Sequence, residues 1–334
     1  MGKIFIDMPI EPDFLNNLKQ IKGIDIDIVE DYVEQQRQFP CFRIKDVEII
    51  FCTFLPLNFL DMKKLKLIQI SSVGYSQLFG LGLAENGIRA CNARGVFDTP
   101  IAEWNIAMMI NLVRNLRGMI RNQEKKIWER PAQFQNEIRG KTVGFWGYGG
   151  IARETARIAS YLGMKIHTLV PDGKIKKREN IYCVEGTGDP EGRLPDKVFS
   201  LNNKKEFLSG IDFLVLSMPL TKRTEGIIGY QELKMLPEGS FLLNPARGPL
   251  IKEQALIKIL REGHLGGVAL DTHYYYPMPA DHPLWDFPGV IMTPHISGSS
   301  LSTHFLERVW TIFVENVNRF LNGKPLLNEL TPFQ

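Results

Sequence analysis

The sequence has no long apolar run and no marked excess of charge of one sign. No stretch approaches the roughly 18 uncharged apolar residues of a transmembrane helix, and the apolar run at residues 4–6 suits a first strand better than a signal peptide. The 40 Lys and Arg residues nearly balance the 37 Asp and Glu residues, and the net charge of +3 is not the strongly basic balance typical of a nucleic-acid-binding protein. We therefore expect a cytoplasmic protein with neither a membrane nor a nucleic-acid partner.

Cysteine is scarce as well. The four cysteines are far apart and form no Cys-x-x-Cys pair. The sequence therefore predicts no disulfide framework and no metal site, and it favours a reducing compartment. A chain of 334 residues is long enough for about two domains whose cores need no covalent staples.

Apolar runs typical of strands alternate with helical stretches along the chain. Ahead of residue 100, we expect helices at 11–21 and 61–64 and strands at 3–7, 25–29, 46–52 and 67–71. From residue 141 a second series has strands at 142–146, 165–170, 212–217, 240–244, 267–271 and 290–293, and a last helix follows at 301–321. This alternation predicts an α/β protein with two doubly wound parallel sheets.

A long helix is expected between the two series. Asp98, Thr99 and Pro100 offer a cap and an early proline, and residues 101–117 run without a break and are apolar on most faces. Such a helix is typically buried between two bodies of protein, so we expect it to link the domains.

A glycine-rich turn opens the second series. Gly147, Gly149 and Ala152 form a Gly-x-Gly-x-x-Ala pattern between an apolar strand and an amphipathic helix. Gly147 permits a tight turn, Gly149 lets a pyrophosphate approach the backbone, and the free N–H groups of the helix start face the phosphates. A glycine-rich loop alone is often a plain turn, but this context predicts a dinucleotide site in a Rossmann domain.

The end of the next strand bears on the choice of cofactor. Val170 stands where an NAD-preferring site usually carries an acidic residue, and Asp172 comes two positions late. A basic run follows at 174–178, which either holds a 2′-phosphate or is a solvated loop. We expect NADPH to be used at least as well as NADH. The loop-rich segment 171–198 either covers the adenosine end, serves a partner, or is a neutral surface insertion, which the sequence favours.

Polar residues follow three later strands of the series. Arg247, Asp271 and His295 lie at or just after the expected carboxyl ends, where open α/β sheets bind their ligands. Each alone could be a surface ion-pair partner, a cap or a loop histidine. Their joint occurrence downstream of the glycine turn predicts a reaction centre.

With these motifs the chain resembles the D-isomer-specific 2-hydroxyacid dehydrogenases and their formate dehydrogenase and corepressor relatives. The matching stretches are Val73-Gly74-Tyr75, Gly87-Ile88-Arg89-Ala90-Cys91-Asn92, Ala102-Glu103, Gly147-Tyr148-Gly149-Gly150-Ile151-Ala152, Met218-Pro219-Leu220-Thr221 with Thr224, Asn244-Pro245-Ala246-Arg247-Gly248, Ala269-Leu270-Asp271 and Thr293-Pro294-His295-Ile296-Ser297-Gly298.

The resemblance implies a role for each matching position. Arg247 would hold the substrate carboxylate and polarise the 2-oxo group, and His295 would be the acid/base group. Asp271 would bind the nicotinamide carboxamide, and Val73 and Gly74 would lie near the substrate carboxylate. The positions that match the cofactor lining are Gly147, Tyr148, Gly149, Gly150, Ile151, Met218, Pro219, Thr224, Pro245 and Ala246.

The resemblance also implies an architecture and an activity. Residues 1–97 and 300–334 would form a flavodoxin-like substrate domain, and residues 98–299 a dinucleotide-binding Rossmann domain that pairs into a homodimer. The chain would be an NAD(P)-dependent oxidoreductase that interconverts a small D-2-hydroxy acid and its 2-oxo acid, such as glyoxylate, hydroxypyruvate or pyruvate.

One departure concerns the partner of the acid/base histidine. Most relatives carry a glutamate before the proline that follows the Asp271 strand, but this chain has Tyr276 before Pro277. We predict that Tyr276 is a third catalytic position, which orients His295 without holding its charge; alternatively, the three consecutive tyrosines simply pack. Formate dehydrogenases also have a neutral residue there, so a formate-type oxidoreductase is one alternative. A non-catalytic, NAD(H)-sensing interaction protein is the other.

Overall fold

The computed structural model describes residues 2–330 and divides them into two compact units. Unit 1 comprises the chain up to Val96, the short segment Glu179–Val184 and the chain from Ser300 onward. Unit 2 comprises Phe97–Arg178 and Glu185–Ser299. Each unit is built on one parallel sheet, so the fold is α/β with two doubly wound sheets.

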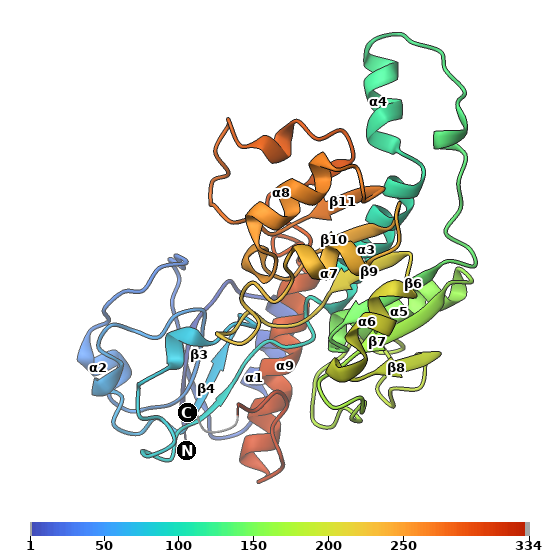
Figure 1. Ribbon diagram of the computed structural model, residues 1–334. Helices are drawn as coiled ribbons and strands as arrows, with labels where there is room; N and C mark the ends of the chain where they lie inside the picture. Colours follow the sequence, from blue (N-terminus) through green and yellow to red (C-terminus); the bar gives the residue numbers. More distant parts are fainter. Residues whose placement is uncertain (1, 331–334) are drawn as a thin grey trace. The chain divides into compact units, whose positions relative to one another are not determined.

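The sheet of unit 1 has five parallel strands in the order β2-β1-β3-β4-β5. Its core forms because apolar side chains fill both faces of the central strands, and Phe51 of β3 stacks on Phe313 of α9 with ring centroids 4.3 Å apart. Figure 1 shows α9 lying beside α1. The elements are β1 (Lys3–Asp7), α1 (Pro12–Lys19), β2 (Asp25–Ile28), α2 (Cys41–Ile44), β3 (Val47–Cys52), β4 (Leu67–Ile70), β5 (Arg89–Cys91) and α9 (Thr303–Leu321).

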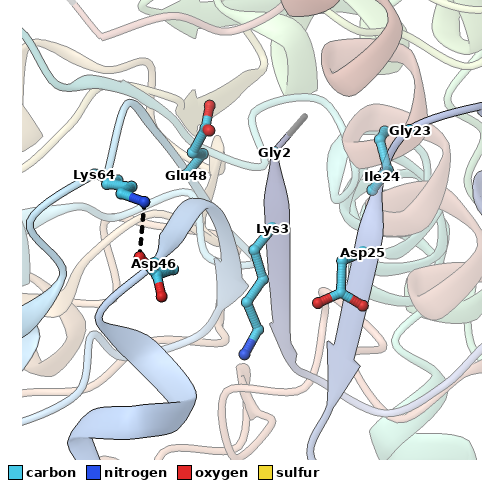
Figure 2. Close-up of a pocket in the computed structure, with 8 residues that line it drawn as sticks. All are labelled: Gly2, Lys3, Gly23, Ile24, Asp25, Asp46, Glu48 and Lys64. Carbon is cyan, nitrogen blue, oxygen red and sulfur yellow. Dashed lines mark ion pairs between the residues drawn. The ribbon is translucent and has the colours of Figure 1, made fainter.

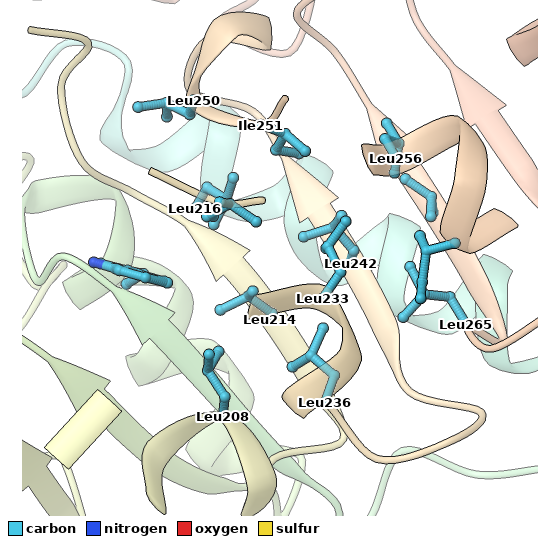
Figure 3. Packing of buried hydrophobic residues seen from close by; sticks show 14 of the residues in the cluster. Leu208, Leu214, Leu216, Leu233, Leu236, Leu242, Leu250, Ile251, Leu256 and Leu265 are labelled. Atoms are coloured by element: carbon cyan, nitrogen blue, oxygen red, sulfur yellow. The ribbon is translucent and has the colours of Figure 1, made fainter. Parts of the chain in front are cut away.

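The sheet of unit 2 has seven parallel strands in the order β12-β11-β10-β9-β6-β7-β8, which is the strand order of a Rossmann domain with one strand added. Figure 3 shows its core, where Leu214 and Leu216 of β9 pack beside Leu242 of β10. The strands are β6 (Thr142–Trp146), β7 (Lys165–Leu169), β8 (Lys197–Phe199), β9 (Phe213–Leu216), β10 (Phe241–Asn244), β11 (Gly267–Leu270) and β12 (Val290–Met292). The helices are α3 (Asp98–Val113), α4 (Leu116–Glu124), α5 (Gly150–Tyr161), α6 (Lys204–Ser209), α7 (Tyr230–Met235) and α8 (Glu253–Arg261).

The strands β5 and β8 and the helix α2 were not expected from the sequence, and three further features differ from the expectations. The helix expected to run unbroken over 101–117 ends at Val113, because Asn115 adopts a left-handed conformation (φ 44°) and caps α4 by accepting the N–H of Gly118. A 3₁₀ turn at Phe59–Asp61 replaces the helix expected at 61–64. Residues 179–184, expected in the dinucleotide-binding domain, belong to unit 1, where Asn328 N donates to Asn180 O.

A hollow lies at the amino-terminal edge of the unit 1 sheet (Figure 2). It is lined by side chains of both signs, and Lys64 pairs with Asp46 within it at 2.8 Å. Open α/β sheets bind ligands at the opposite, carboxyl edge. We therefore assign no function to this hollow.

Over residues 2–330, no helix is long and apolar enough to cross a membrane. The same residues contain no group of three or more His, Cys, Asp or Glu side chains placed to hold a metal ion. All four cysteines are free, and Cys52 and Cys91 are buried.

Candidate active site

The carboxyl ends of five neighbouring strands in unit 2 carry the residues that the sequence singled out. Gly147 follows β6, Met218 follows β9, Arg247 follows β10, Asp271 follows β11 and His295 follows β12. Because these strands are parallel and adjacent in the sheet, their carboxyl ends share one edge. The fold of unit 2 thus gathers residues that are up to about 150 positions apart in the sequence.

The glycine-rich turn has the geometry that a dinucleotide needs. Gly147 has a φ of +95°, and a Cβ there would lie 2.8 Å from the carbonyl oxygen of Ser217, so only glycine fits. A Cβ on Gly149 would meet nothing within 4 Å, which leaves the backbone open to a phosphate. Ala152 is fully buried and lets α5 pack closely on the sheet. The turn and the start of α5 therefore fit the diphosphate of NAD(P), and they would hold it through backbone N–H groups.

The other positions matched to the cofactor lining divide into two groups. Pro219 and Thr224 belong to one tight turn after β9, in which the Thr224 hydroxyl donates to the carbonyl of Pro219 at 2.7 Å. Tyr148 is different, because its side chain is buried and its hydroxyl donates to Asp189 at 2.8 Å. The side chain of Tyr148 therefore supports the turn from within the protein.

The loop after β10 is folded by the buried side chain of Asn244. Its Oδ1 accepts the N–H groups of Ala246 and Arg247, and its Nδ2 donates to the carbonyl of Arg247 at 2.9 Å. The Arg247 side chain is exposed and donates to the carbonyl of Ala246. Within the described part of the chain, no carboxylate pairs with Arg247. Its guanidinium is thus an uncompensated positive group suited to an anionic ligand.

Asp271 holds the loop that carries His295. Its carboxylate is fully buried and accepts four hydrogen bonds, from Thr293 Oγ1 at 2.6 Å, Ile296 N at 2.9 Å, Ser297 N at 3.1 Å and Ser297 Oγ at 2.5 Å. His295 lies inside this clamp with a φ of +60°, a conformation that few residues other than glycine adopt. The clamp therefore keeps His295 in a strained but fixed position.

The electrostatics around His295 favour a neutral imidazole. Partial burial of the exposed His295 side chain lowers its pKa below the ordinary histidine value, and Asp271 opposes this effect in part. The positive charge of Arg247 and the neighbouring His273 lower the pKa further. At neutral pH, His295 is therefore mostly uncharged.

Tyr276 meets His295 through ring packing. Their ring centroids are 5.6 Å apart and the rings are tilted by 50°. The Tyr276 hydroxyl accepts the backbone N–H of His273 at 3.2 Å. Among residues 2–330, Asp271 is the carboxylate whose charge raises the pKa of His295, and Tyr276 adds no charge beside the ring.

His273 is a residue of this site that the sequence reasoning missed. Its side chain is buried, and Nε2 lies 2.8 Å from the carbonyl oxygen of Thr293. Its Nδ1 is buried and has no hydrogen-bond partner within residues 2–330. Because Thr293 accepts from it, Nε2 carries the proton. No local sequence pattern marked this histidine, because its hydrogen-bond partner, Thr293, lies twenty residues later in the chain.

Val73 and Gly74 lie in unit 1, just after the carboxyl end of β4. The side chain of Asn92 donates to the carbonyl of Val73 at 2.8 Å, and Ser72 Oγ donates to that of Gly74 at 2.7 Å. A Cβ on Gly74 would meet nothing within 4 Å. The backbone here is held in place and remains open on the side of Gly74.

The chain is similar to known proteins over most of its length. Residues 106–297 match the family model described as D-isomer specific 2-hydroxyacid dehydrogenase, NAD binding domain. A Haemophilus influenzae protein named as a 2-hydroxyacid dehydrogenase is 32% identical over 271 residues, covering 77% of this chain and 80% of its own. The glyoxylate reductase of Thermofilum pendens is 26% identical over 330 residues, covering 96% of this chain and 92% of its own.

Solved structures show the same fold. The crystal structure of a D-isomer specific 2-hydroxyacid dehydrogenase from Xanthobacter autotrophicus, in complex with NADPH and MES, has a TM-score of 0.74 and 23% sequence identity. The match covers 99% of this chain and 98% of that one. The likeness therefore extends over both units.

Proposed function

The chain belongs to the family of D-isomer-specific 2-hydroxyacid dehydrogenases, NAD(P)-dependent oxidoreductases, and we propose that its own reaction interconverts a small D-2-hydroxy acid and its 2-oxo acid. The observation that carries this proposal is the pair at the edge of the unit 2 sheet. An uncompensated guanidinium, Arg247, follows β10, and a clamped imidazole, His295, follows β12; the two strands flank β11 in one sheet.

Arg247 supplies the binding and the polarisation in this proposal. A planar guanidinium donates two parallel hydrogen bonds to a carboxylate. The same group can donate a further N–H to the 2-oxo oxygen and stabilise the negative charge that develops there. The backbone at Val73 and Gly74 is the second proposed contact for the substrate.

His295 acts as the general acid and base in this proposal. A bound NAD(P) supplies the hydride acceptor or donor through its nicotinamide ring. In reduction, the imidazolium of His295 gives its ring N–H proton to the 2-oxo oxygen as the hydride reaches C2. In oxidation, the neutral imidazole takes the hydroxyl proton as the hydride leaves C2. Asp271 and Tyr276 position the ring for both directions.

Initial rates with a panel of 2-oxo acids test the proposal. We expect oxidation of NADPH and NADH by at least one of glyoxylate, hydroxypyruvate and pyruvate, with NADPH used at least as well as NADH. Two features support NADPH. Val170 leaves no carboxylate at the end of β7, and the exposed Lys174 and Lys176 form no ion pair among the described residues. A strong preference for NADH would contradict this choice of cofactor.

Turnover also separates two other activities. The neutral surroundings of His295 suit formate oxidation, which needs no proton transfer from a carbon-bound hydroxyl. Formate-dependent reduction of NAD(P), with no reduction of 2-oxo acids, would favour that alternative. Tight dinucleotide binding with no turnover of any kind would instead favour an NAD(H)-sensing interaction protein.

A pH profile tests the role of Tyr276. Because burial lowers the pKa of His295, the protonated form needed for reduction should be lost as pH rises through a value below the ordinary histidine pKa of about 6.5. Tyr276→Glu should stabilise the imidazolium and move the alkaline limb of kcat/KM for reduction upward by about one pH unit. The neutral Tyr276→Gln is the matched control. An unmoved profile in the glutamate variant would remove Tyr276 from the proposal.

A homodimer formed through unit 2 is part of the same proposal. Ile120 of α4 and Ile127 and Trp128 in the following loop are exposed, Trp128 by 91%. An apolar surface of this kind is typical of a contact with a second copy. Figure 1 shows α4 and this loop extending from the rest of unit 2.

A further inference from the structure

The connection between β7 and β8, residues 170–196, is packed against the glycine-rich turn through a buried arginine. Arg153, in α5, is 3% exposed. Its guanidinium donates to the carbonyls of Tyr148, Asp189 and Lys176, the last at 2.6 Å. One side chain therefore joins the turn to two points of the connection. This differs from the neutral surface insertion that the sequence favours.

Asp189 makes a second junction to the same turn. Its carboxylate is 6% exposed and accepts the hydroxyl of Tyr148 and the backbone N–H groups of Arg193 and Leu194, at 2.8 to 3.0 Å. In addition, the buried carboxylate of Glu154 in α5 accepts the N–H of Gly188. Buried charged groups satisfied in this way fix the position of a segment. The connection is thus a structural part of the dinucleotide site.

The fixed connection brings Arg178 toward the start of α5. Arg178 donates to Asp98 Oδ2 at 3.1 Å. The Asp98 carboxylate in turn lies directly against Gly150, where a Cβ would collide with Oδ2. Gly150 is the first residue of α5. The guanidinium of Arg178 is therefore placed beside the N-terminus of the helix that receives the diphosphate.

Two features of this pair point to a phosphate. The Nη2 atom of Arg178 is buried and has no hydrogen-bond partner among the described residues, so the guanidinium retains donor capacity beyond Asp98. The Asp98 carboxylate alone would repel a dianionic diphosphate at the helix start, and Arg178 compensates that charge. A guanidinium can bridge a carboxylate and a phosphate because its N–H groups point in several directions.

We propose that Arg178 is a binding residue for the diphosphate of NAD(P). The 170–196 connection carries this side chain, and Asp98 orients it. The inference deepens the proposed function at its cofactor site and rests on dinucleotide binding, not on the identity of the acid substrate. In this proposal the connection helps to bind NADH and NADPH equally well through their common diphosphate. The lysines proposed for the 2′-phosphate act on NADPH alone.

Dissociation constants measured by calorimetry for NADH, NADPH and ADP-ribose test this proposal. Arg178→Gln should raise all three by a similar factor, roughly tenfold to a hundredfold, because a hydrogen bond to a charged group is lost. Arg193→Gln is the matched control, since Arg193 lies in the same connection but its side chain is 83% exposed. The control should bind all three ligands like the wild type. Thermal melting checks that each variant is folded.

The double variant Asp98→Asn/Arg178→Gln shows whether Arg178 contacts the diphosphate or only compensates the charge of Asp98. It also keeps the test valid if the single variant folds poorly. If Arg178 contacts the diphosphate, the double variant stays at least tenfold weaker than the wild type. Recovery of wild-type affinity would mean that Arg178 only neutralises Asp98, and a loss confined to NADPH would place Arg178 at the 2′-phosphate. Either result overturns the proposal, as does unchanged binding by Arg178→Gln. A wild-type chain that binds no dinucleotide would overturn the proposed function as well.

Discussion

Arg247→Ala should lower kcat/KM for every 2-oxo acid substrate by on the order of a thousandfold, which corresponds to about 4 kcal/mol. The guanidinium has no carboxylate partner among residues 2–330, so its charge is available to the substrate. Removing it leaves the substrate carboxylate without its bidentate partner and the developing oxyanion without a donor. Steady-state kinetics with the substrate found in the panel would measure the loss.

The controls for Arg247 distinguish catalysis from folding. The side chain is exposed, and the loop is folded by Asn244, so truncation should leave thermal stability within about 0.5 kcal/mol of the wild type. The Kd for NADPH should also stay the same. Arg247→Lys should recover only part of the activity, because an ammonium cannot donate in a fork. A variant that retains more than a tenth of wild-type kcat/KM would exclude Arg247 as the carboxylate anchor.

His295→Asn should lower kcat by about a hundredfold to ten-thousandfold, the range expected for loss of a general acid/base. Asparagine is chosen because it tolerates the left-handed backbone that His295 adopts, so the loop should keep its shape. The remaining activity should no longer depend on the pKa of an imidazole. Rates measured from pH 5 to 9 would show a flat profile in place of the wild-type decline.

His295→Ala provides the comparison for backbone strain. Both substitutions remove the proton carrier, but alanine fits a positive φ less well than asparagine, so only this variant should also lose thermal stability. Dinucleotide binding should survive in both, because the glycine turn lies after a different strand. A pH profile that persists in His295→Asn would mean that another group carries the proton, and His273 would be the first residue to test.

The sequence alone determined the elements whose signals are local. The strand, turn and helix around Gly147 were identifiable because a tight turn with positive φ requires glycine at one position, and the apolar periodicity of the flanking segments is short-range. The placement of Arg247, Asp271 and His295 at one sheet edge also followed from sequence. Parallel strands bring their carboxyl ends together whatever the details of packing.

Only the tertiary structure decided features that depend on partners far apart in the chain. The break at Asn115 was not foreseen, because Leu116 keeps the helical spacing of the apolar residues before it. The burial of Arg153 and Asp189 arises from contacts between α5 and a connection that looked like solvated loop. Arg178 and Asp98 are 80 residues apart. Their pairing exists because Gly150 leaves room for a carboxylate, a steric fact that no local pattern encodes.

His295 shows the same division. The sequence predicted its position after the last strand. Its lowered pKa results from partial burial and from the neighbouring Arg247 and His273, which follow other strands. The fold gives the Asp271 carboxylate four hydrogen bonds that hold the His295 loop, and its binding of the nicotinamide carboxamide stays a prediction. Sequence thus determined which chemical groups reach the site. Long-range packing decided their charge states, because a pKa depends on burial and on neighbouring charges. It also decided their hydrogen-bond partners, because other strands supply them.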